Sequence, residues 1–109
     1  MRRHWFFILL SLAERDRHGS AIMRDVLELT DGELRLWPVT LYGSLEELQE
    51  HGYIQPLAAA PDDAQEEGGR RRWFRISPRG RRALAAEVRR MGELVRVAQG
   101  RLVHAGDAS

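Results

Sequence analysis

The sequence contains no cysteine and no lysine, and its most apolar stretch is short. Without cysteine the chain has no disulfide framework, no thiolate zinc site and no thiol nucleophile. The apolar run at residues 5–10 is too short to span a bilayer, and charge returns at Glu14 before any small-residue cleavage site. We therefore expect a cytoplasmic protein with no membrane segment, in which this run is a buried helix.

Net charge is also scarce, because 17 basic and 16 acidic residues leave a formal charge of +1. A field around the whole molecule is therefore not what attracts a partner. The two signs are separated along the chain, since residues 46–67 hold acids but no arginine, and residues 70–82 hold arginines but no acid. The basic block is either a footprint for a polyanion or a solvated surface. The exclusive use of arginine suits phosphate binding, although genomic base composition also produces it.

A chain of 109 residues has room for one core, and its patterns predict four helices and two strands. The predicted helices cover residues 4–15, 20–30, 38–51 and 78–104. The predicted strands cover residues 53–57 and about 70–77, with a mobile loop at 58–69 between them. The fold class is therefore mainly α with a small β-hairpin. We expect a winged helix-turn-helix domain at 1–77 (wing about 53–77), a C-terminal dimerisation helix at 78–104 and a disordered tail at 105–109.

The last predicted helix begins with a hydroxyl N-cap, Ser77, followed by a proline at its first position. Apolar residues then recur at steps of four and three, which is a heptad pattern. The residues of this seam are Leu84, Val88, Met91, Val95, Ala98 and Leu102. The seam predicts either an ordinary helix that closes the core or, as we prefer, a contact with a second copy of the chain.

The order of helices and strands is that of a winged helix-turn-helix, in which the third helix offers its N-terminal half to the DNA major groove. Its small, hydroxylated and aromatic side chains suit close contact with bases and phosphates. The predicted DNA-contact residues are Arg24, Arg35, Pro38, Val39, Thr40, Tyr42, Gly43, Ser44, Arg70, Arg71 and Arg72. The acids Glu46, Glu47 and Glu50 fall on the last two turns and should tilt away from DNA. Trp37 and Trp73 are interpreted as supports for the DNA-facing elements.

Several motifs together resemble the PadR-like family of transcriptional regulators. They are Ile8-Leu9-Leu10-Ser11-Leu12 with His18-Gly19, Trp37-Pro38-Val39-Thr40-Leu41-Tyr42, Glu50-His51-Gly52-Tyr53-Ile54 and Arg71-Arg72-Trp73-Phe74-Arg75-Ile76-Ser77-Pro78. The resemblance implies a homodimeric repressor that acts on a pseudo-palindromic operator, with the terminal helix and Trp5 of the first helix at the dimer interface. It also implies a small aromatic effector near that interface. Trp5, Phe6, Met91 and Val95 are the candidate ligand residues, and core packing is the alternative for them.

Two other function classes remain to be weighed. The acidic stretch and the near-zero net charge favour a protein–protein interaction module that keeps the winged helix without binding DNA. An enzyme is disfavoured, because the four histidines have no metal-ligand spacing and no Gly-rich phosphate loop or nucleophile elbow is present. We expect no cofactor and no metal.

Overall fold

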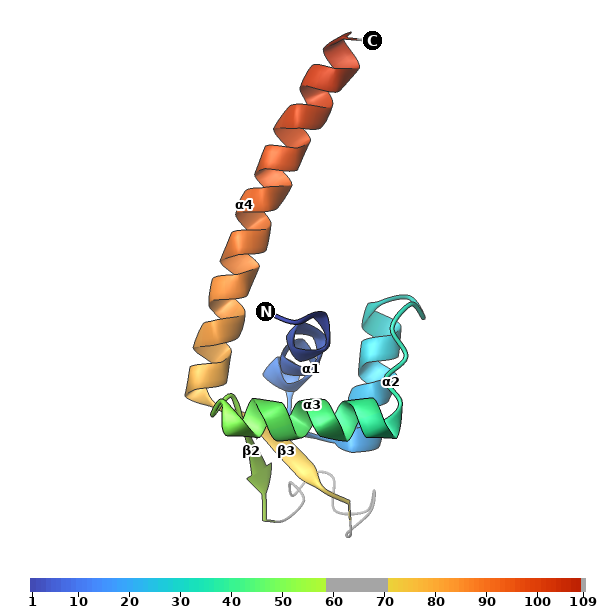
Figure 1. Ribbon diagram of the computed structural model, residues 1–109, viewed down its shortest axis with the longest axis vertical. Helices are drawn as coiled ribbons and strands as arrows, with labels where there is room; N and C mark the ends of the chain where they lie inside the picture. Colours follow the sequence, from blue (N-terminus) through green and yellow to red (C-terminus); the bar gives the residue numbers. More distant parts are fainter. Residues whose placement is uncertain (59–70, 109) are drawn as a thin grey trace.

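The computed structural model describes residues 1–58 and 71–108. The elements follow the order α1 (Arg3–Glu14), β1 (Arg17–His18), α2 (Gly19–Leu29), α3 (Pro38–Glu50), β2 (Ile54–Leu57), β3 (Trp73–Ile76) and α4 (Pro78–Ala108). This arrangement confirms the mainly α fold with a winged helix-turn-helix and a long C-terminal helix (Figure 1). The first three helices lie within one residue of their predicted bounds.

The sheet contains a strand that the sequence did not predict. β1 is two residues long and pairs antiparallel with β3, placing Arg17 opposite Phe74 and His18 opposite Trp73. On its other side β3 pairs antiparallel with β2, so that the strand order is β1-β3-β2. The wing is therefore joined by backbone pairing to the segment between α1 and α2.

The returning strand of the wing is shorter than predicted. β3 begins at Trp73, so Arg71 and Arg72 precede the strand instead of belonging to it. Arg70 and the predicted loop, apart from Ala58, lie outside the described residues.

One hydrophobic core joins the helices to the sheet. α1 contributes Ile8, Leu9 and Leu12, while α3 contributes the predicted stripe Leu41, Leu45 and Leu48. Phe74 of β3 is fully buried among them. Leu84 of α4 is only 6% exposed and belongs to the same core. Assigning Leu84 to a dimer seam is therefore a correction: the heptad pattern begins on the protomer's own core before it reaches free surface.

The start of α4 is fixed by Ser77, as its sequence predicts. The Ser77 hydroxyl accepts a hydrogen bond from the Gly80 amide at 3.0 Å, which is an N-cap contact. The same hydroxyl donates to the Gly52 carbonyl at 2.6 Å. Gly80 packs so closely that a Cβ there would lie 2.0 Å from the Tyr53 carbonyl oxygen. These contacts fix the direction in which α4 leaves the domain.

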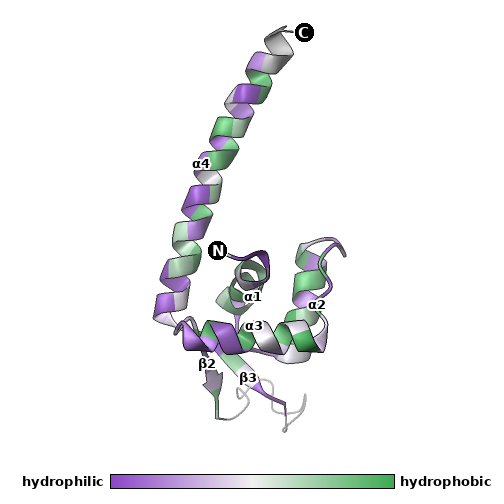
Figure 2. Ribbon diagram, viewed as in Figure 1, coloured by the Kyte–Doolittle hydropathy of each residue, from purple (hydrophilic) through white to green (hydrophobic). Residues whose placement is uncertain are grey.

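Beyond its first turns, α4 projects away from the rest of the chain (Figure 1). The molecule measures 59 × 28 × 26 Å as a result. The helix continues through Ala108, so residues 105–108 are helical and not the frayed tail that was expected; Ser109 lies outside the described residues. Apolar and polar residues alternate along this projection (Figure 2). In the described part of the chain, no helix is long and apolar enough to cross a membrane.

Candidate nucleic-acid interface

The N-terminal half of α3 presents an uncharged surface to solvent. Leu41, Leu45 and Leu48 face the core, and the opposite side of the helix is therefore exposed. Val39 is the extreme case at 87% exposure. The other exposed residues of this surface are Pro38, Thr40, Tyr42 and Gly43. Five of the six predicted contact residues on α3 therefore share an accessible surface.

Ser44 is the exception among them, because only 6% of it is exposed. It lies on the side of α3 that faces the start of α1, where it lines a cavity of about 240 Å³ together with Trp5 and Thr40. Including Ser44 among the contacts was wrong for a physical reason. It is three residues from Leu41 and adjoins Leu45, so helical periodicity turns it toward the core.

Tyr42 is held from two sides. The guanidinium carbon of Arg72 lies 5.6 Å from the Tyr42 ring centroid and 5.4 Å from that of Phe74, both within cation–π range. On the other side, a Cβ at Gly19 would come within 2.4 Å of the Tyr42 hydroxyl oxygen. Glycine at the start of α2 therefore makes room for this tyrosine. Together these contacts place Tyr42 of α3 between the start of α2 and Arg72, which directly precedes β3.

Arg71 is attached to the start of α2 through His18. The Arg71 guanidinium lies 3.1 Å from His18 Nε2, and His18 Nδ1 accepts a hydrogen bond from the Ala21 amide at 3.2 Å. His18 is buried and packs edge-on against Trp73 at a centroid distance of 4.9 Å. The sequence analysis named His18 only as part of a family motif and missed its position between Arg71, Trp73 and the start of α2. The available signal was its place directly before the α2 helix, where a side-chain acceptor caps the first turn.

These contacts produce one surface from elements far apart in the sequence. Ser20, Tyr42, Arg71 and Arg72 line a cavity of about 270 Å³ beside the start of α2. A second cavity of about 410 Å³ lies between Arg72 and α3. Glu46 lines this second cavity, so it does not tilt away from the surface as expected.

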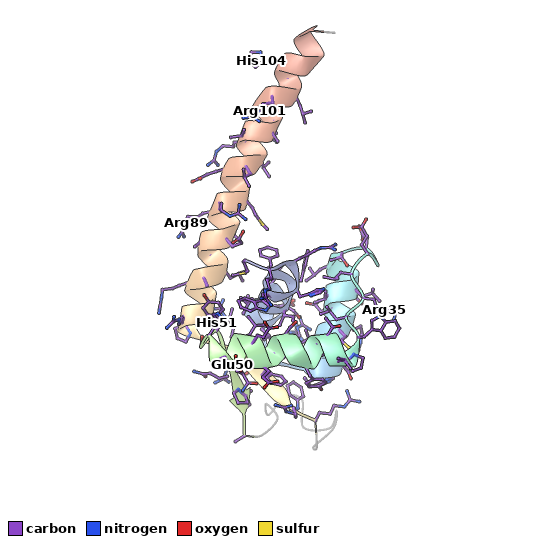
Figure 3. The ribbon with its side chains drawn as sticks, viewed as in Figure 1. Arg35, Glu50, His51, Arg89, Arg101 and His104 are labelled. Atoms are coloured by element: carbon purple, nitrogen blue, oxygen red, sulfur yellow. The ribbon has the colours of Figure 1, made fainter. Side chains whose placement is uncertain are left out.

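The other two acids of α3 are placed differently, because Glu47 lines the cavity of about 240 Å³ together with Val39 and Thr40, whereas Glu50 is the last residue of the helix. Glu47 accepts a hydrogen bond from Arg2 at 2.6 Å, on the side of α1. Glu50 lies at the C-terminal end of α3, next to His51, whereas Arg35 lies beyond the N-terminal end (Figure 3). Arg35 and Glu50 therefore mark opposite ends of α3.

Arginines in this region divide into paired and unpaired groups. Asp16 accepts hydrogen bonds from Arg75, with a shortest distance of 2.8 Å, and this contact raises the pKa of the Arg75 guanidinium. Arg17 likewise lies 2.9 Å from a Glu14 carboxylate oxygen. Among the described residues, the predicted contact arginines have no carboxylate partner: Arg24, Arg35, Arg71 and Arg72. Unpaired guanidiniums beside an uncharged helix surface are suited to an anionic partner.

The sequence model of the transcriptional regulator PadR-like family matches residues 8–86, which is most of the chain. This chain belongs to the PadR-like family. It is therefore a transcriptional regulator, and the motifs quoted from its sequence lie mostly within the matched region. The winged-helix fold of this chain is therefore that of a family of DNA-binding regulators.

Solved structures share the fold of this chain, and one curated relative is similar to it in sequence. A PadR family transcription regulator from Clostridium difficile superposes with a TM-score of 0.77, covering 93% of this chain and 99% of that one at 22% identity. A transcriptional regulator from Clostridium thermocellum gives a TM-score of 0.70 at 24% identity, covering 88% of this chain and 86% of that one. An uncharacterized 37.1 kDa protein in transposon TN4556 of Streptomyces fradiae is 37% identical over 80% of this chain. The match spans only 22% of that longer relative.

The residues predicted to form a dimer interface and a ligand site occupy two environments in the structure. Trp5 is half-buried on the domain, edge-on to His51 at 4.7 Å and to Tyr53 at 6.3 Å. Phe6 is also partly buried against the core. The remaining predicted residues of α4 are exposed: Val88, Met91, Val95, Ala98 and Leu102. Trp5 and Phe6 are therefore partly covered within one protomer, whereas the exposed α4 residues are accessible to a second copy or to a ligand.

Within residues 1–58 and 71–108, no group of three histidine, aspartate or glutamate side chains is arranged to hold a metal ion. The family and the structural neighbours are transcription regulators and not enzymes.

Proposed function

We propose that this PadR-like regulator is a sequence-specific repressor that binds a pseudo-palindromic operator as a homodimer. The observation that carries the proposal is the exposed, uncharged start of α3 together with Arg35, Arg71 and Arg72, which have no carboxylate partner among the described residues. The first turns of α3 enter the major groove, and Arg71 and Arg72 at the start of the returning wing strand contact the adjoining phosphate backbone. Residues 1–77 form the DNA-binding unit and α4 the dimerisation unit.

The side chains on α3 read base edges in this proposal. Val39 supplies methyl groups for contact with thymine, and the Thr40 hydroxyl hydrogen-bonds a base edge or a phosphate. Gly43 leaves open space on the same side, since a Cβ there would meet nothing within 4 Å. Tyr42 supplies a phenol whose position is fixed by Arg72 and Gly19.

The arginines supply affinity without sequence information. Arg24, Arg35, Arg71 and Arg72 contact phosphates, and Arg70 is proposed to join them from its position outside the described residues. Each phosphate contact adds close to one unit to the dependence of log K on log salt concentration.

Dimerisation covers the exposed seam of α4. Val88, Val95 and Leu102 are 49%, 53% and 70% exposed, an unfavourable arrangement for a helix surrounded by water. A second copy packed along this seam, with Trp5 at its edge, would remove these residues from water and hold two DNA-binding domains together. We further propose that a small aromatic effector binds beside Trp5, Phe6, Met91 and Val95 and relieves repression in the cytoplasm.

A mobility shift on the DNA upstream of the protein's own coding region tests the DNA-binding proposal. The R71A/R72A variant should bind at least tenfold more weakly and show a salt slope smaller by about two. R89A/R96A is the matched control, because it removes the same charge from the projecting part of α4, where Figure 3 shows Arg89. Equal affinities for wild type and R71A/R72A would instead favour the protein–protein interaction module.

A further inference from the structure

Trp37 is exposed in a way that the fold does not explain. The residue is 64% accessible, whereas Trp73 is 5% accessible and Trp5 is packed partly against the core. An indole carries a large apolar surface, and leaving it in water forgoes the stabilisation that its burial would bring. The sequence analysis interpreted Trp37 as a support for the DNA-facing elements. Its exposure shows that it does not provide this support by packing into the core.

Trp37 has no capping role either. It occupies the N-cap position of α3 with extended backbone angles, φ −83° and ψ 156°, and its side chain makes no cap hydrogen bond. Serine, threonine or aspartate at this position would accept a hydrogen bond from the first turn. The first backbone bond of α3 runs from the Leu41 amide to the Trp37 carbonyl, which leaves the preceding amides without an intrahelical partner.

The segment before α3 presents Arg35 and Trp37 together. Leu34 and Leu36 are buried, so the alternation of an extended chain turns the side chains of Arg35 and Trp37 outward. The Arg35 guanidinium carbon lies 5.7 Å from the Trp37 ring centroid, within cation–π range. This pair combines an apolar ring face, a fixed positive charge and a helix N-terminus in one place.

We infer that Trp37 and Arg35 form a clamp on the sugar–phosphate backbone of operator DNA, with the indole packed on deoxyribose and the guanidinium on a phosphate. The inference rests on the proposed function and extends it to a residue outside the predicted contact set. DNA is the occupant that fits, because exposed Val39 lies two residues beyond Trp37 and because Arg35 has no carboxylate partner in the part of the chain that the structure describes. An apolar partner would offer no group that pairs with the Arg35 guanidinium.

The clamp lies away from the proposed dimer seam. Figure 3 shows Arg35 beyond the N-terminal end of α3, on the side of the domain opposite α4. A second copy packed along the projecting part of α4 would therefore leave this end of α3 available. The clamp thus extends the DNA-binding surface at the end of α3 farthest from Glu50 and His51.

Substitution separates the two halves of the clamp. W37A should weaken binding to the upstream DNA about tenfold, because an apolar contact is lost, and should leave the salt slope unchanged. R35A should weaken binding and lower the slope by about one. W37F retains a ring and should recover most of the affinity, while circular dichroism and thermal melting of W37A confirm that the domain is folded.

Acrylamide quenching of tryptophan fluorescence reports the contact directly. The chain has three tryptophans, and the quenching component that W37F lacks belongs to Trp37. That component should be strong in the free protein and should disappear when upstream DNA saturates the wild type. If the wild type binds this DNA while Trp37 stays fully quenchable, or if W37A binds as tightly as wild type, the clamp is overturned and the repressor proposal survives. If the wild type shows no sequence preference, both fail.

Discussion

Gly19 shows how one residue at the start of α2 controls a side chain on α3. The absence of a Cβ lets the Tyr42 hydroxyl approach closely, and Leu41 approaches the same point at 3.3 Å. Tyr42 is then fixed between this glycine and Arg72. The spacing of Gly19 and Tyr42 in the sequence gives no indication of this contact, which exists only once α2 and α3 are packed.

Gly19→Ala should therefore weaken DNA binding as well as lower stability. The new methyl group forces Tyr42 out of its place, which costs about 1–2 kcal/mol of unfolding free energy because the displaced ring is partly exposed. Losing the Tyr42 contact should weaken operator binding about fivefold or more. Titration with fluorescently labelled operator measures the affinity, and chemical denaturation measures the stability.

Gly100→Ala is the control for this substitution, because a Cβ at Gly100 meets nothing within 4 Å. It should leave operator affinity unchanged and stabilise α4 slightly. Wild-type operator affinity in Gly19→Ala would show that Tyr42 is not placed by this contact.

For single residues, the sequence patterns predicted which side chains are exposed better than they predicted which side chains are in contact. Val39 and Thr40 were assigned to the DNA surface from their place after Pro38, and both are exposed. Ser44 was assigned with them because it is small and hydroxylated, but helical rotation buries it. The His18–Arg71 contact joins residues 53 positions apart, which a single sequence does not reveal.

Among the secondary-structure elements, α4 has two parts with different environments. Leu84 lies in the protomer core, whereas Leu102 is 70% exposed. The sequence shows one uninterrupted heptad seam and gives no sign of this division. The first part follows from the contact of α4 with α1, and the second is free to contact another chain.

Two matched substitutions separate these parts. Leu84→Ala should lower the unfolding free energy by about 2–4 kcal/mol, because it opens a cavity in the core. Leu102→Ala should leave the domain intact and raise the dimer dissociation constant at least about tenfold. Denaturation and sedimentation equilibrium over a range of protein concentrations measure the two quantities. If the dimer dissociation constant of Leu102→Ala equals that of the wild type, a dimer built on the α4 seam is contradicted.

The elements themselves were largely predictable, and the exceptions have a common cause. Helices α1, α2 and α3 are defined by local periodicity and by Pro38 and Asp31-Gly32 as boundary signals. β1 has two residues and exists only through pairing with β3, so no local pattern marks it. The small residues near the C-terminus suggested fraying, yet the helix continues through Ala108.

The whole molecule consists of a compact winged-helix domain and a helix that extends beyond it. After Glu87, α4 continues for about 30 Å at 1.5 Å per residue, with its apolar residues in water. The small net charge of +1 conceals arginines such as Arg35, Arg71 and Arg72, which have no carboxylate partner within residues 1–58 and 71–108. Both features make sense if the working molecule contains two chains and binds one polyanion.

Hydroxyl-radical footprinting on the upstream DNA tests this account most directly. Two protected segments should appear about one helical turn apart, related by an approximate two-fold axis. The segments should fade together in R71A/R72A and persist in R89A/R96A. Protection that is uniform along the DNA, or confined to a single unrepeated segment, would contradict a sequence-specific homodimer.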